Sequence, residues 1–118
     1  MTLRSSQLHK LRRFAKFSFI ALVFIIAYIA FLPNYEALPE FTSLSDILNH
    51  FAAFLVLALF LDIGFQVKIR TAFLILMSYG LFIEVVQYFL PNRHFDLLDV
   101  LVDLTGCIVY YLIKKIFV

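Results

Sequence analysis

The chain alternates between long apolar runs and short polar clusters. The apolar runs cover 14–32, 47–63, 71–90 and 97–113. A hydrocarbon core about 30 Å thick is crossed by roughly 17 to 25 helical residues, whereas a transmembrane strand needs only about 10, with an alternation that these runs lack. The pattern predicts an all-α polytopic membrane protein, a single domain over 1–118, with four transmembrane helices at about 14–32, 46–64, 70–90 and 96–115.

Composition favours a membrane protein over a soluble one. The sequence is 64% hydrophobic and 15% charged, with a mean hydropathy of +0.97, whereas a soluble domain is about 25% charged. A basic start followed by an apolar run is also typical of a secretory signal peptide. We favour a retained first helix, because its apolar run is longer than a signal core and Leu32, Pro33 and Asn34 form no small-residue cleavage pattern.

Lysine and arginine residues predict the orientation of the chain. Five stand at or before the start of the first apolar run, and four more lie between the second and third runs or after the fourth. Only Arg93 falls on the other predicted side. Cytoplasmic loops carry the excess of Lys and Arg, so we expect both termini in the cytoplasm. The basic start favours contact with anionic lipid and not with nucleic acid.

Acidic residues gather on the opposite predicted side. Asp62 is the one acidic residue near the cytoplasmic side, and the other seven lie in the outer half of the chain. At 100° per residue, the polar positions of the fourth helix share an arc of about 80°. These positions are Asp96, Asp99, Asp103, Gly106 and Tyr110.

The second and third helices carry polar faces of the same kind. Asp46 and His50 share one side of the second helix, and Glu84 and Gln87 share one side of the third. From the rise of 1.5 Å per residue, His50, Glu84 and Asp103 lie at similar depths, roughly 7 to 10 Å below the outer helix ends. Three helices are therefore expected to build a common site, and the first helix packs against it or seals it.

Some of these polar residues have a purely structural interpretation. Asp46 and Asp96 stand at predicted helix starts, where capping or the helix dipole accounts for a carboxylate. Ionisable residues deep inside membrane helices cost a few kcal/mol each and usually line a cavity. That cost favours a functional role for Glu84, Asp99 and Asp103.

Charge balance raises the question of what accompanies these carboxylates. The candidate cations on this side are Arg93, His50 and His94. Either some carboxyl groups stay protonated, or a metal or a cationic ligand compensates them. The sequence contains no compact metal-ligand motif, so we predict no metal site and assign no cofactor.

The same residues resemble the VanZ-like family of small membrane proteins. The resemblance covers about 60 residues as a spaced pattern. Two positions depart from the family: Ile47 stands where Lys is usual, and Asp103 where Asn is usual. Tyr110 also stands where a second small residue is expected one turn beyond Gly106. The matching positions are Asp46 to His50 with Phe51 following, then Glu84, Gln87, Arg93, Asp96, Asp99 and Gly106 in the run EVVQYFLPNRHFDLLDVLVDLTG.

The resemblance implies a compartment more than an activity. The family is known mainly for low-level resistance to the glycopeptide teicoplanin, and most members have no defined activity. Glycopeptides act on the cell wall outside the membrane, which agrees with an outward-facing site. In this reading Asp103, in place of the usual Asn, changes which ligand the site accepts.

We expect a multi-pass protein of the bacterial inner (cytoplasmic) membrane that binds or modifies a lipid or a lipid-linked cell-envelope component and thereby affects glycopeptide susceptibility. Its expected partners are membrane lipids and a lipid-linked cell-wall precursor. Arg93 suits a phosphate or carboxylate headgroup. His50, Glu84 and Asp99 are the candidate catalytic residues, with His50 as acid or base. The predicted ligand-binding residues are Asp46, His50, Glu84, Gln87, Arg93, Asp96, Asp99 and Asp103.

Three other function classes stay open at this point. A membrane-embedded hydrolase or transferase could use paired carboxylates if one stays protonated, although no nucleophile is evident. A structural accessory subunit would need the polar residues only to join helices. Ion transport is disfavoured, because the helices are apolar between Glu84 or Asp103 and Asp62. The number of chains in the assembly is not predicted.

Overall fold

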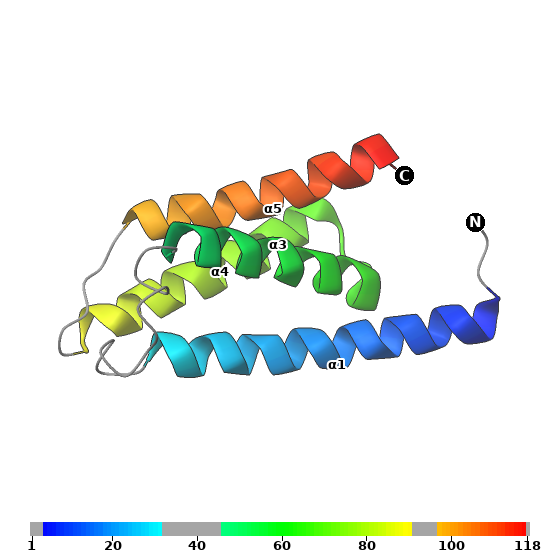
Figure 1. Cartoon of the computed structure of the whole chain (residues 1–118), viewed down its shortest axis with the longest axis horizontal. Helices are drawn as coiled ribbons and strands as arrows, with labels where there is room; N and C mark the ends of the chain where they lie inside the picture. Colours follow the sequence, from blue (N-terminus) through cyan, green and yellow to red (C-terminus); the bar gives the residue numbers. More distant parts are fainter. Residues whose placement is uncertain (1–3, 32–45, 91–96, 118) are drawn as a thin grey trace.

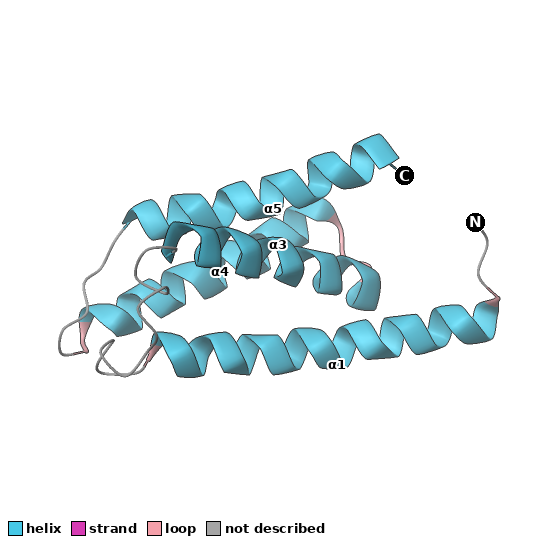
Figure 2. Cartoon of the chain, viewed as in Figure 1, coloured by secondary structure: helices cyan, strands magenta, loops and turns pink. Residues whose placement is uncertain are grey.

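The computed structural model describes residues 4–31, 46–90 and 97–117, with 46 and 47 described in their backbone alone. It contains four helices, and Figure 2 shows helix with short connections throughout the described residues. Three of the helices begin and end within two residues of their predicted bounds. The helices are α1 Ser5–Ala30, α3 Asp46–Phe65, α4 Ile69–Tyr88 and α5 Leu97–Phe117.

The first helix is longer than its apolar run. It was predicted from residue 14, but α1 begins at Ser5. The backbone N–H of Arg4 donates to Gln7 Oε1 at 3.0 Å and so stabilises the first turn. Lys, Arg, Leu and Gln are good helix formers, so the basic segment continues the helix beyond the apolar positions.

Three of the four helices are long and apolar enough to cross a membrane: α1, the part Leu48–Phe65 of α3, and α4. All four present large exposed apolar side chains, for example Phe24, Leu48, Leu74 and Leu112. Such a surface suits lipid and not water. The chain is therefore a membrane protein. The helix α5 carries two aspartates and two lysines, so its crossing, and with it the count of four spans, stays a prediction.

The helices run back and forth along one long axis (Figure 1). The start of α1, the connection from α3 to α4 and the end of α5 lie at one end of the bundle (Figure 1). This arrangement agrees with both termini lying on one side of a membrane. Which side is cytoplasmic still rests on the Lys and Arg count.

The core is built around α3, which contacts each of the other helices. Its fully buried side chains include Phe54 and Leu57. These belong to one cluster with Leu76 of α4 and Cys107 of α5, against which partly buried residues of α1 pack. The apolar core lies in the middle of the bundle, so polar side chains are left to gather at its two ends.

Two glycines permit the closest helix contacts. A Cβ atom on Gly106 would lie 2.5 Å from the carbonyl oxygen of Phe51, which brings α5 against α3. A Cβ atom on Gly64 would lie 2.9 Å from the backbone nitrogen of Lys16, which brings α3 against α1. The second predicted helix ended at Gly64. Instead α3 continues to Phe65, and Gln66 takes the left-handed conformation after it (φ 52°).

Candidate functional site

A histidine and three carboxylates converge near the end of the bundle opposite the start of α1. His50 lies in the second turn of α3, and Glu84 lies in the last turns of α4. Asp99 and Asp103 lie one turn apart near the start of α5. Both α3 and α5 start at this end of the bundle and α4 finishes there (Figure 1), so these positions meet at a common depth, as the sequence predicted.

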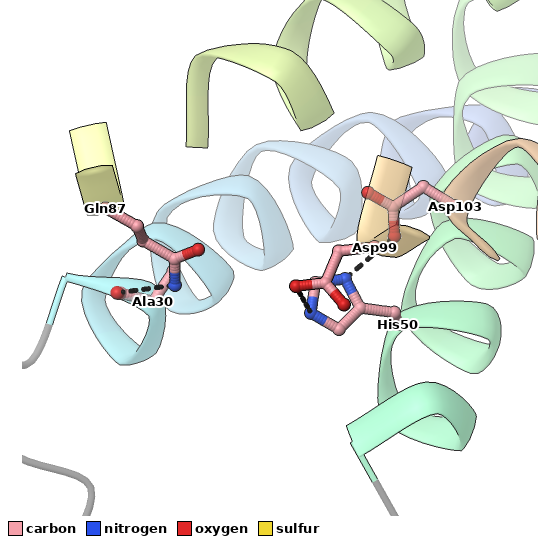
Figure 3. Close-up of polar contacts among 5 residues, drawn as sticks. All are labelled: Ala30, His50, Gln87, Asp99 and Asp103. Carbon is pink, nitrogen blue, oxygen red and sulfur yellow. Dashed lines mark hydrogen bonds and ion pairs between the residues drawn. The ribbon is translucent and has the colours of Figure 1, made fainter. Parts of the chain in front are cut away.

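His50 is held between the two aspartates of α5 (Figure 3). Its Nδ1 atom lies 2.9 Å from Asp103 Oδ1, which is a hydrogen bond. Its Nε2 atom lies 3.8 Å from Asp99 Oδ2, at the distance of an ion pair. When Asp103 is ionised it can only accept, and Nδ1 of His50 then carries the proton. The other ring nitrogen, Nε2, faces Asp99.

Access differs between the two aspartates. The side chain of Asp99 is 17% exposed and that of His50 is 19% exposed, whereas that of Asp103 is only 2% exposed. A molecule approaching from outside would therefore meet His50 and Asp99 first. Asp103 instead orients the imidazole from behind, the arrangement by which a carboxylate fixes the tautomer of a histidine.

Gly80 makes room for Asp103. A Cβ atom at this position of α4 would lie 2.9 Å from Asp103 Oδ2 and 3.4 Å from the Phe54 ring. Gly80 was not among the predicted site residues. Its spacing of four residues from Glu84, which puts both on one face of α4, is the signal that could have identified it.

Glu84 completes the cluster from α4 and is fully buried. One ligand atom each from His50, Glu84 and Asp99 lie within 4.8 Å of one another. One imidazole nitrogen and two carboxylate oxygens from three helices form a donor set that suits a divalent cation. The sequence predicted no metal, because the three residues are far apart along the chain. That expectation stays a prediction.

Gln87 lies on the same face of α4 but has a different contact. Its Nε2 atom donates to the carbonyl oxygen of Ala30 at 3.0 Å, and both residues are buried. Figure 3 shows this pair apart from the cluster of His50, Asp99 and Asp103. The hydrogen bond ties the end of α1 to α4, a role for the first helix that goes beyond sealing. Ligand contact by Gln87 stays a prediction.

The remaining predicted site residues are not placed. Arg93 and Asp96, together with His94, lie outside the described residues. Asp46 begins α3, but its side chain is not described. Their predicted contacts with a ligand stay predictions.

The predicted polar face of α5 is confirmed in its described part. Asp103, Gly106 and Tyr110 are buried on one side of the helix. The absence of a small residue at Tyr110 does not prevent close packing, because α3 and α5 approach each other at Gly106 itself. Tyr110 instead donates its hydroxyl to Asp62 Oδ2 at 2.7 Å.

Comparison with known proteins supports the resemblance read from the polar pattern. A family model described as VanZ/LLP1 matches residues 2–118. The chain belongs to the VanZ/LLP1 family. A protein of the fission yeast Schizosaccharomyces pombe, described as uncharacterized, is 38% identical over 94 residues. The match covers 75% of this chain and 55% of the yeast protein, so the chain spans about half the length of that relative. No solved structure matches.

Proposed function

We propose that the chain binds the polar headgroup of a lipid, or of a lipid-linked cell-envelope component, at the outer end of the bundle. The observation that carries the proposal is His50, fixed by Asp103 on one nitrogen and facing the partly exposed Asp99 with the other. Glu84 stands beside them as a buried acceptor from a third helix. A preorganised donor and acceptor set at membrane depth is typical of a binding site.

The chemistry of the set favours hydroxyl or amine groups in the ligand. Carboxylate oxygens of Glu84 and Asp99 accept hydrogen bonds from such groups, and charge-assisted bonds are the stronger kind. His50 Nε2 accepts when the ring is neutral and donates when it is protonated. In this proposal Arg93, which lies outside the described residues, contacts a phosphate or carboxylate of the same headgroup.

The proposed location is the bacterial inner membrane, with both termini cytoplasmic and the site facing outward. Family membership supports a membrane role, and the Lys and Arg count supports the orientation. A relative in a fission yeast favours a headgroup common to many membranes as the ancestral ligand. Binding of a lipid-linked wall precursor, with its effect on glycopeptide susceptibility, would then be a specialised use of the same site.

Native mass spectrometry of the purified chain tests the proposal. Wild type, Asp99→Asn and Glu84→Gln are compared for lipid retained through purification. We expect a lipid adduct on wild type that both variants lose. Ser78→Ala is the control, because Ser78 is exposed near the middle of α4, away from both polar ends of the bundle, and it should keep the adduct. The same number of bound lipids on wild type and on all three variants would contradict the proposal.

A second candidate function is hydrolysis or group transfer with His50 as the general base. The Asp103 hydrogen bond favours it, because a carboxylate on Nδ1 orients the ring and stabilises its protonated form. Incubation of the purified chain with a bacterial polar lipid extract, followed by mass spectrometry of the products, tests this function. His50→Gln should abolish product while the lipid still binds. Absence of any product with the wild-type chain excludes turnover of the lipids in that extract.

A further inference from the structure

A pocket with charged residues in its lining lies at the opposite end of the bundle from His50. It has a volume of about 480 Å³. Its walls come from three segments: α3, the connection into α4 with the first residue of that helix, and the last turns of α5. The lining residues are Asp62, Val67, Ile69, Tyr111, Lys114 and Lys115.

The pocket carries a surplus of positive charge. Lys114 Nζ lies 2.8 Å from Asp62 Oδ2, and the Tyr110 hydroxyl donates to the same oxygen at 2.7 Å. Asp62 is thus neutralised by Lys114, which is held in place and keeps further N–H donors for another acceptor. Lys115 adds a second ammonium group to the lining without a second carboxylate.

The beginning of α4 adds to this positive potential. The backbone N–H groups in the first turn of a helix have no acceptor within the helix, and the helix dipole is positive there. Lys68, the residue before the helix, forms no side-chain cap. Gln66, in its left-handed conformation, turns the chain so that Val67 and Ile69 form one wall. A 20-residue helix therefore begins at the pocket.

Tyr111, which lines the pocket, carries an unused hydrogen-bond donor beneath the pocket surface. The hydroxyl of Tyr111 is buried and has no hydrogen-bond partner among the described residues. Its ring packs against Phe73, with the centroids 5.6 Å apart. A buried polar group without a partner lowers stability, so an acceptor in the pocket would improve the fit of this side chain.

Apolar side chains flank the charged residues. Ile69, Ile116 and Phe117 are exposed beside or beyond the pocket. Positive groups next to exposed apolar ones match the two parts of a lipid, a charged headgroup and acyl chains. A soluble anion would use only the charged part.

We propose that this pocket binds the phosphate group of an anionic lipid in the membrane leaflet on the Lys- and Arg-rich side. Lys115, Lys114 and the start of α4 contact the phosphate, and a small rotation of the Tyr111 side chain brings its hydroxyl to one of the phosphate oxygens. The site is separate from the outer cluster of His50 and does not depend on the function proposed for that cluster.

Competition between two lipids tests the proposal on the delipidated full chain. Equal amounts of phosphatidylglycerol and phosphatidylcholine are added, and native mass spectrometry gives the ratio of the two bound. We expect phosphatidylglycerol to dominate, and Lys115→Ala to lower its ratio roughly fivefold, the effect of one basic residue at a membrane surface. Lys10→Ala is the control, because it removes an exposed charge on the same side outside the pocket.

Tyr111→Phe keeps the ring and removes the unpartnered hydroxyl. We expect it to lower the phosphatidylglycerol ratio while the melting temperature without lipid is unchanged or raised. Asp99→Asn should leave the ratio unchanged. If Lys115→Ala and Lys10→Ala behave alike, or if Asp99→Asn alone removes the lipid, the inner pocket is not the site. If inorganic phosphate raises the melting temperature as much as the lipid does, the ligand is a soluble anion and the lipid assignment is wrong.

Discussion

The two ends of the bundle carry polar clusters of opposite design. The inner cluster, at the end predicted to be cytoplasmic, joins one carboxylate, Asp62, to an ammonium group and a phenol hydroxyl on a single oxygen. The described part of the outer cluster, at the other end, places one imidazole beside carboxylates from two helices. The inner cluster therefore neutralises its acid within the chain, whereas the outer one concentrates acceptors around a titratable ring. The first arrangement fastens helices, and the second is suited to a ligand.

The largest expected effect comes from the close contact between α5 and α3 at Gly106. Gly106→Ala would place a Cβ atom 2.5 Å from the Phe51 carbonyl oxygen, a backbone atom that cannot rotate away. Separating α5 from α3 should cost about 3 kcal/mol of unfolding free energy. Denaturant titration in detergent micelles measures it. Since α3 and α5 supply residues to both clusters, lipid binding at both ends should fall together.

Ser78→Ala provides the control for that measurement. Ser78 is exposed on α4, so its replacement should change stability by less than about 0.5 kcal/mol. A Gly106→Ala chain as stable as this control would show that the two helices can separate without cost.

A pair of substitutions contrasts the two clusters directly. Asp62→Ala leaves the Tyr110 hydroxyl without its acceptor and should cost about 1 to 2 kcal/mol. The Lys114 ion pair adds little to this, because Lys114 is 42% exposed and the pair is screened. Asp103→Asn removes a buried charge, keeps an acceptor for His50 and should leave stability unchanged or raised.

Thermal unfolding of both variants gives the comparison. Ligand binding at the outer end should change in Asp103→Asn and persist in Asp62→Ala. Two equal losses of stability would mean that both clusters are structural, which is the accessory-subunit interpretation.

The smallest expected effect lies in the connection between α3 and α4. Gln66 has a φ of 52°, a conformation that costs a residue with a Cβ atom roughly 1 kcal/mol. Gln66→Gly should therefore stabilise the chain by about 0.5 kcal/mol or leave it unchanged, since glycine also gains entropy in the unfolded state. The melting temperature reports the change, and a clear decrease would mean that the Gln66 side chain makes a stabilising contact.

Much of the fold could be predicted from the apolar runs of the sequence. The apolar runs fixed the ends of α3, α4 and α5 to within two residues, because length and hydropathy are set by the membrane. The start of α1 was misplaced, because a basic helix has no apolar run to mark it. The helix contact of Gly64 was not predictable for a related reason: glycine occurs both at helix ends and at close helix contacts, and only the packing of α1 distinguishes the two.

The outer cluster was predictable because its members are polar where the membrane disfavours polarity. His50, Asp99 and Asp103 were placed together by helical periodicity and depth, and the structure joins them. The partner of Gln87 was not predictable, because it is the backbone carbonyl of Ala30 and every residue carries a backbone carbonyl. The link from Asp62 to Lys114 and Tyr110 was missed for another reason, because residues 48 or more positions apart must first be brought together by packing.

The charges of α5 bear on how the chain enters its membrane. Two aspartates and two lysines make this helix too polar for a candidate span on composition alone. An Asp or Lys costs an inserting helix about 2.5 to 3.5 kcal/mol at its centre and less toward its ends. The partners that offset this cost, His50 and Asp62, both belong to α3, which is synthesised earlier. If α5 crosses the bilayer as predicted, its insertion is coupled to folding, because an α3 already in place supplies the partners of its charged side chains.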